Sequence, residues 1–278
     1  MWSVVQYGAF GADMLSSAGY EMVVFFFVLS GFFIRYAQLR RPRPVLQFYV
    51  NRIARIYPPY AVSLALAAGV LSYLAHFHPV LLSATTDREL SAGLLMAWHE
   101  MPSFSLSTLF RTLVFLKSGE YFIACNKVYW SLLPEAMFYL AVPFAFQHVR
   151  TYYALSTILY VYGLVAGALQ INISFLLEQI ILYNGFFALG VGLYDVVTKN
   201  LRWLAFFRRA SGAGLVLVAV GLLVLLICAS VMHKYAFSGA VASILAVLSI
   251  SSLLSGRVNR QNILIKGLHE LGIFSELV

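Results

Sequence analysis

Residues Gly212–His233 read GAGLVLVAVGLLVLLICASVMH and contain no Asp, Glu, Lys or Arg. A helix needs about 20 such residues to cross the hydrocarbon core of a bilayer, which is ~30 Å thick. The rest of the chain has a similar character, since 61% of its 278 residues are hydrophobic and 11% are charged. Soluble proteins contain roughly 45–50% apolar and about 25% charged residues. The composition therefore excludes a soluble globular protein and predicts an integral membrane protein.

Further apolar stretches extend this pattern over most of the chain. The seven stretches long enough to span are Gly19–Leu39, Pro58–His78, Val128–Gln147, Thr151–Leu169, Ile173–Val197, Gly212–His233 and Ala236–Leu254. We find no internal repeat and no low-complexity tract. The sequence thus predicts an all-α, polytopic transmembrane helix bundle of about seven spans, forming a single domain over residues 1–278. A shorter stretch, Ser107–Lys117, carries Arg111 and predicts a re-entrant or interfacial helix.

The basic residues orient the predicted spans. The chain has 19 Lys and Arg against 11 Asp and Glu, a net charge of +8. Of the 19 basic residues, 14 fall on one set of alternate connections between spans, which marks that side as cytoplasmic. This count puts the start of the chain outside and its end inside. The basic residues do not form the aromatic-plus-basic platform that single-stranded nucleic acid needs, so no nucleic-acid partner is expected.

A carboxylate inside a predicted span is the first candidate for chemistry, because buried ionisable groups are costly in a membrane. Glu135 lies about 12 Å from the outer end of the Val128–Gln147 span. Ser131, Glu135 and Tyr139 are four residues apart and share one helix face. A Glu that is simply hydrogen-bonded to another helix remains an equal alternative. For Glu178, in the Ile173–Val197 span, the structural interpretation is favoured.

A pair of arginines is the second candidate. Arg52 and Arg55 are three residues apart and point the same way on a helix at the cytoplasmic boundary. Pro58 and Pro59 follow and predict a break in the helix. Two guanidinium groups beside such a break suit a phosphate or a carboxylate. An ordinary positive-inside cluster is the alternative and, from these residues alone, the favoured one.

Histidine and cysteine residues carry less information. None of the His residues has a carboxylate or cysteine neighbour at metal-ligand spacing, so no metal site is expected. Cys125 lies in a polar connection and Cys228 inside an apolar run. The different membrane depths of these two positions argue against a disulfide.

Three motifs, in order along the chain, resemble those of the acyltransferase-3 family of integral-membrane acyltransferases. Residues 26–32, FFVLSGF, are similar to the family's FFVLSGF signature. Residues 52–60, RIARIYPPY, are similar to its RxxRIxPxY signature, and residues 130–139, WSLLPEAMFY, to its WSLxxExxFY signature. Residues Phe186–Gly192 are similar to a later helix of the family. The resemblance covers the chain from about residue 20.

The resemblance implies an enzyme that transfers an acyl group, often acetyl, from cytoplasmic acyl-CoA to a hydroxyl of a cell-envelope glycan. It implies a multi-pass protein of the bacterial inner membrane, with lipid, acyl-CoA and the glycan as partners and no resident cofactor. The residues implied are, for catalysis, Glu135, Ser131 and Tyr139; for donor binding, Arg52, Arg55 and Tyr57; and as structural motif residues, Ser30, Gly31 and Trp130. Glu135 is expected nearer the outer side than the arginines, where an acceptor hydroxyl would arrive.

The sequence also departs from the family pattern. Family members have an earlier helix that carries an Arg and, ten residues further along, a His that acts as catalytic base. This sequence contains no such helix with that Arg and His before its first predicted span. Residues 271–274, LGIF, resemble the start of a last-helix motif that stops early. An incomplete member of the family is therefore expected. The alternatives are a catalytically inactive membrane scaffold fragment and, less favoured, a transporter, which would need paired broken helices.

Overall fold

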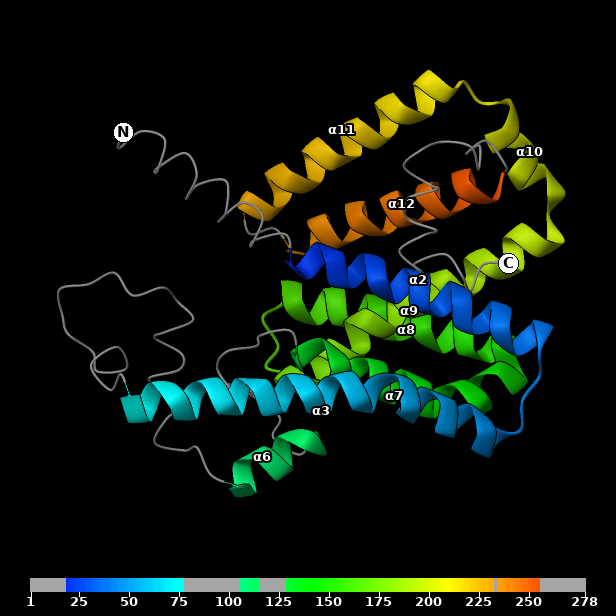
Figure 1. The fold of residues 1–278 in the computed structure, drawn as a ribbon. Coiled ribbons are helices and arrows are strands. Elements are labelled where there is room, and N and C mark those ends of the chain that lie inside the picture. The colour runs from blue at the N-terminus through cyan, green and yellow to red at the C-terminus, as the bar shows by residue number, and fades with distance from the viewer. Residues whose placement is uncertain (1–18, 78–105, 116–128, 233–234, 256–278) are drawn as a thin grey trace, which may run out of the picture. The chain divides into compact units, whose positions relative to one another are not determined.

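The structure is a computed structural model, and it describes residues 19–77, 106–115, 129–232 and 235–255 (Figure 1). Every regular element in these residues is a helix, which confirms the predicted all-α class. The described helices are α2 (Gly19–Arg40), α3 (Val45–Phe77), α6 (Leu106–Leu113), α7 (Tyr129–Ala145), the 3₁₀ turn η2 (Phe146–His148), α8 (Val149–Ala168), α9 (Phe175–Lys199), α10 (Leu201–Arg209), α11 (Gly212–Val231) and α12 (Tyr235–Leu254).

Five of the described helices are long and apolar enough to cross a membrane, namely α2, α3, α9, α11 and α12. The expected number of about seven is not confirmed. The other two predicted spans do form helices, but α7 has only 17 residues, and the first turns of α8 contain Arg150 and several hydroxyl-bearing side chains. Large apolar side chains are exposed along α11, including Leu217 at 72%. Exposed apolar surface of this extent suits contact with lipid.

The chain divides into two compact units, which we describe separately. One unit contains α2, α10, α11, α12 and α9 from Gly185 onward. The other runs from Arg41 to Asn184 and contains α3, α6, α7, η2, α8 and the start of α9. The prediction of a single domain over residues 1–278 stays a prediction.

In the first unit, α2 and α9 pack backbone against backbone. A Cβ atom at Gly31 would collide with the carbonyl oxygen of Phe187, and one at Gly190 would collide with that of Val28. Small residues allow helices to approach this closely in membranes. Gly31 of α2 lies against Phe187 of α9, and Arg35 further along α2 lies against Asp195 further along α9. The two helices therefore run parallel. The Lys/Arg count requires the same direction for these two spans.

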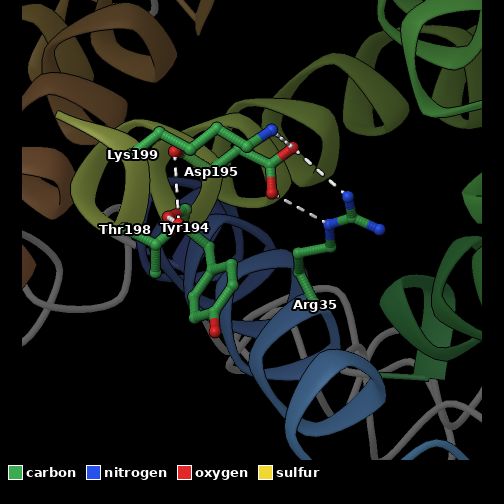
Figure 2. Close-up of polar contacts among 5 residues, drawn as sticks. All are labelled: Arg35, Tyr194, Asp195, Thr198 and Lys199. Atoms are coloured by element: carbon green, nitrogen blue, oxygen red, sulfur yellow. Dashed lines mark hydrogen bonds and ion pairs between the residues drawn. The ribbon is translucent and has the colours of Figure 1, made fainter.

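The same two helices are joined by a buried ion pair near their C-terminal ends (Figure 2). Arg35 Nε donates to Asp195 Oδ1 at 3.0 Å and Arg35 Nη2 donates to Asp195 Oδ2 at 3.3 Å. Lys199 Nζ lies 3.5 Å from Asp195 Oδ2, one helical turn along α9. The ring of Tyr194 packs edge-on against Phe32 beside the pair. Asp195 therefore has its charge compensated by two cations.

Helix α12 completes this unit alongside α2 (Figure 1). Gly239 of α12 lies against the Tyr20 hydroxyl and the Phe186 ring. At the other end of α12, Ser251 Oγ accepts a hydrogen bond of 3.0 Å from Trp203 Nε1 of α10. The α10 helix is basic in its last turn and is capped by the Asn200 side chain, which accepts from the Arg202 amide.

In the second unit, α3 is one continuous helix through both prolines, so the predicted break at Pro58 and Pro59 is wrong. The proline nitrogens cannot donate to the carbonyls of Ala54 and Arg55, yet the helix continues because tertiary contacts hold it on both sides. Tyr60 Oη donates to the Thr112 carbonyl at 2.6 Å. The Tyr60 ring also stacks on Phe115, with centroids 5.2 Å apart.

The Thr112 and Phe115 contacts bring α6 against α3. With eight residues, α6 is too short to span, as the sequence predicted for this segment.

A polar network links α8 with the first part of α9. Asn184 Oδ1 accepts from Tyr152 Oη at 3.0 Å, and Asn184 Nδ2 donates to Ser156 Oγ at 2.9 Å. Further along, a Cβ on Gly163 would come within 2.9 Å of side-chain atoms of Ile181 and Leu182. Ser156 is buried and the other two side chains are partly buried, so their polar groups need partners, and the Asn184 amide supplies both a donor and an acceptor.

Candidate active site

The candidate site lies between α3 and α7 in the second unit. The two helices run antiparallel and are tied by Tyr49 Oη, which donates to the Leu140 carbonyl at 2.9 Å. One turn along α3 from Tyr49, Arg52 faces the turn of α7 that carries Tyr139. This register brings together the arginine motif and the carboxylate motif, which are about 80 residues apart in the sequence.

Arg52 is held between two aromatic rings. Its guanidinium carbon lies 5.3 Å from the centroid of Phe48 and 5.2 Å from that of Tyr139. The guanidinium group also makes a side-chain hydrogen bond to Tyr139, so both the ring and the hydroxyl group of Tyr139 position it. The Arg52 Nε atom is buried and has no hydrogen-bond partner among the described residues. The Nε–H group of Arg52 is thus held in place but makes no hydrogen bond among the described residues.

Glu135 and Tyr139 form the other half of the site. Their side chains are 6% and 5% exposed, and Tyr139 Oη donates to Glu135 Oε1. The hydroxyl group and the carboxylate lie one turn apart on α7, as the four-residue spacing predicted. Ser131, one turn before Glu135, is also buried. The three α7 residues predicted for catalysis are therefore all buried.

The charges of Arg52 and Arg55 both act on the Glu135 carboxylate. Helix α7 itself has no nearby basic residue, so the compensating cations come from α3. Arg55 is exposed, whereas Arg52 is half-buried. Arg52 faces the turn of α7 that carries Tyr139, and Glu135 lies one turn nearer the start of α7. The expectation that Glu135 lies nearer the outer side than the arginines stays a prediction.

The remaining predicted residues have other surroundings. Tyr57 is half-buried, and its ring packs edge-on against Tyr60 of α3 and against Phe115, which follows α6. Ser30 and Gly31 belong to the first unit, where Gly31 allows the close approach of α2 and α9. The side chains of Trp130 and Glu178 lie outside the described part of the structure, as does Cys125. Cys228 is a free, exposed cysteine.

Two buried acids were missed by the sequence analysis. Asp195 lies near the end of a predicted span, and its partner Arg35 was interpreted only as an orientation signal. Glu21 lies in the first turn of α2 and is 1% exposed. The rule that singled out Glu135, an acid within an apolar stretch, applies equally to both residues.

The fold and the site define a multi-pass helical membrane protein with an arginine–tyrosine–glutamate cluster. The family model described as an acyltransferase domain, that of acyltransferase-3, matches residues 2–275. The chain belongs to this family of membrane acyltransferases, as the three motifs predicted. No curated protein matches the chain. No solved structure matches it either.

Proposed function

We propose that this chain transfers an acyl group, acetyl in the simplest case, from cytoplasmic acyl-CoA to a hydroxyl of a cell-envelope glycan in a bacterial inner membrane. The observation that carries the proposal is the junction of Arg52 and Arg55 with Glu135 and Tyr139 in one cluster. Acyl transfer needs an anion site for the donor and a polar group that handles the hydroxyl proton. The cluster supplies both kinds of group.

The donor would be held by the two arginines. Arg52 has an unused buried Nε–H, and Arg55 extends an exposed guanidinium three residues further along α3. Phosphate oxygens accept from guanidinium groups in a fixed geometry that an ammonium cannot reproduce.

In the transfer step, the acceptor hydroxyl oxygen attacks the thioester carbonyl carbon, and the carbon–sulfur bond breaks. The hydroxyl proton leaves the oxygen and finally resides on the thiol of CoA. Glu135 and Tyr139 would assist this proton movement, since a phenol bonded to a carboxylate can pass on a proton. The two cations from α3 would compensate the carboxylate charge during the step.

The test uses membranes that contain the full chain, supplied with acetyl-CoA carrying a radiolabelled acetyl group. We expect label in the polysaccharide fraction, released by mild alkali as an ester would be. Glu135→Gln should lower incorporation by about 10²–10⁴-fold, the usual contribution of acid–base assistance. Arg150→Ala, at an exposed position in the same unit, serves as the control. Equal incorporation with and without the chain would overturn the proposal.

A further inference from the structure

Helix α10 connects two helices that are long and apolar enough to cross a membrane, α9 and α11. It is capped at its start by the Asn200 side chain, and α11 is capped at its start by the Ser211 side chain. With nine residues, α10 is about 13 Å long, which is too short to reach the other side of a bilayer. It therefore lies at the boundary where α9 ends and α11 begins. In the orientation given by the Lys/Arg count, this is the cytoplasmic boundary.

One face of α10 is fixed by packing within the first unit. Trp203 Nε1 donates to Ser251 Oγ of α12, and Phe207, one turn further along α10, is 2% exposed. The rings of Trp203 and Phe207 lie 5.6 Å apart. These contacts set the rotation of α10 about its own axis. They therefore decide which of its side chains point away from the rest of the unit.

The opposite part of α10 carries two arginines with a phenylalanine between them. Arg202, Phe206 and Arg209 lie within about 60° of one another around the helix. This arc is turned by roughly 110° from the packed rings. Phe206 is 65% exposed, and both arginines are exposed. We call these three residues the α10 face.

Acidic residues do not compensate the charge of the α10 face. The sequence contains no Asp or Glu between Asp195 and Glu270. Asp195 itself is already held in the buried ion pair described above. Neither Arg202 nor Arg209 has an ion-pair partner among the described residues. The α10 face therefore presents two positive charges around an exposed aromatic ring.

This combination of groups suits the surface of a membrane. There an aromatic ring enters the boundary between headgroups and acyl chains, while the guanidinium groups remain among the headgroups. A dissolved anion would pair with the arginines but would leave the Phe206 ring in water. An anionic headgroup matches the two arginines better than a zwitterionic one, which also carries a positive group. A lipid with net negative charge is thus the ligand that fits both features.

We propose that the α10 face binds the headgroups of anionic phospholipids. The phosphate oxygens of the lipid accept hydrogen bonds from Arg202 and Arg209, and the Phe206 ring lies against the first carbons of the acyl chains. This contact fixes the connection between α9 and α11 at the membrane surface. It uses none of the residues of the α3–α7 cluster, so it is independent of acyl transfer.

The experiment measures which lipids lie next to α10 in proteoliposomes of phosphatidylglycerol and phosphatidylcholine with identical acyl chains. The full chain carries Cys125→Ser and Cys228→Ser, and the fluorophore NBD is attached at Ala205→Cys, a partly exposed position beside Phe206. A nitroxide near the top of the acyl chain is placed on one lipid or on the other. Quenching of NBD by each labelled lipid gives the relative affinity of the two headgroups.

Two double variants are compared in this labelled chain. The first, Arg202→Gln with Arg209→Gln, removes both charges of the α10 face. The matched control, Arg41→Gln with Arg43→Gln, removes two other exposed arginines that the Lys/Arg count assigns to the same side of the membrane. The control thus has the same net charge as the first variant but leaves the α10 face intact.

We expect phosphatidylglycerol to bind about five- to 25-fold more tightly than phosphatidylcholine next to the label, because each arginine near an anionic surface contributes about a factor of five. The α10 double variant should bring this ratio close to one, and the control should leave it unchanged. Equal quenching by the two lipids in the parent chain would overturn the proposal, as would an equal fall in the control. Absence of quenching by either lipid would also overturn it and would indicate that the α10 face meets a soluble partner instead.

Discussion

In the described part of the chain, the pair Arg35 and Asp195 and the pair Arg52 and Glu135 each combine a guanidinium group with a buried carboxylate, and the two pairs differ in their contacts. Arg35 and Asp195 meet through two hydrogen bonds, and their side chains are 8% and 10% exposed. Arg52 acts on Glu135 through its charge, with its guanidinium held by two rings and its Nε without a partner among the described residues. The first pair has satisfied its hydrogen bonds, whereas the second retains an unused donor.

This difference separates a structural ion pair from a site prepared for a ligand. A bidentate arginine–carboxylate pair leaves few donors for anything else. In the α3–α7 cluster, Glu135 accepts from Tyr139, and the Nε atom of Arg52 has no hydrogen-bond partner among the described residues. The comparison predicts that substitutions at Asp195 change stability first, and that substitutions at Arg52 change ligand binding first.

The largest effect is expected from Asp195→Leu. Loss of the carboxylate leaves the buried Arg35 uncompensated, which should lower the free energy of unfolding by about 3–5 kcal/mol. The double variant Arg35→Leu with Asp195→Leu should recover most of this loss, because neither charge remains. Unfolding in mixed micelles measures both. A double variant no more stable than Asp195→Leu alone would show that the ion pair is not the source of the loss.

The Arg52→Ala substitution should act mainly on the donor. Loss of one charge-assisted contact is worth about 1.5–3 kcal/mol, which is a fall of roughly 10- to 150-fold in acetyl-CoA affinity. Arg52→Lys should restore only part of it. Calorimetric titration with acetyl-CoA measures the effect, with Arg150→Ala as the matched control. Unchanged affinity would return the arginines to the role of orientation signals.

Tyr139→Phe tests whether the phenol keeps the two groups apart. The ring that faces Arg52 remains, but Glu135 loses its donor and Arg52 loses its hydrogen bond to Tyr139, so the free energy of unfolding should fall by about 1.5 kcal/mol. The exposed Tyr162→Phe should change it by less than about 0.5 kcal/mol. Chemical unfolding of both variants makes the comparison. Equal effects at the two positions would argue against a contribution from the Tyr139–Glu135 hydrogen bond.

The smallest effect is expected from Lys199→Ala. Its side chain is 74% exposed, so the contact with Asp195 should contribute at most about 0.5 kcal/mol and weaken with salt. In the Arg35→Leu background the same change should cost more, because Lys199 is then the cation nearest Asp195. A double-mutant cycle at low and high salt measures this coupling. Additive effects would show that Lys199 does not share the Asp195 charge.

The family and the helical class were both predicted from the sequence. Motif spacing alone put Ser131, Glu135 and Tyr139 on one face of a helix, and the structure has all three buried there. The junction of Glu135 with Arg52 was not accessible. The register between α3 and α7 decides that contact, and no local pattern encodes the register.

The errors have a common physical origin. Pro58 and Pro59 were expected to end a helix, because local propensity disfavours the residue before a proline. Contacts of Tyr60 and Arg52 on either side keep α3 continuous. In the same way, Arg35 was counted among exposed orientation signals, because only the fold reveals that Asp195 is opposite. In both cases the structure depends on a tertiary contact that the local sequence pattern did not predict.

Gly31 of α2 and Gly190 of α9 limit which substitutions this protein can accept during evolution. At Gly31 and at Gly190, the atom that an added Cβ would meet belongs to the partner's main chain. No substitution on the neighbouring helix can remove a carbonyl group, so trimming a side chain cannot make room. A selection for revertants of Gly31→Ala should therefore yield true reversion, or changes that move a whole helix, rather than compensating replacements at the contact. Each of the two positions is thus constrained by the main chain of the neighbouring helix, which no side-chain substitution removes.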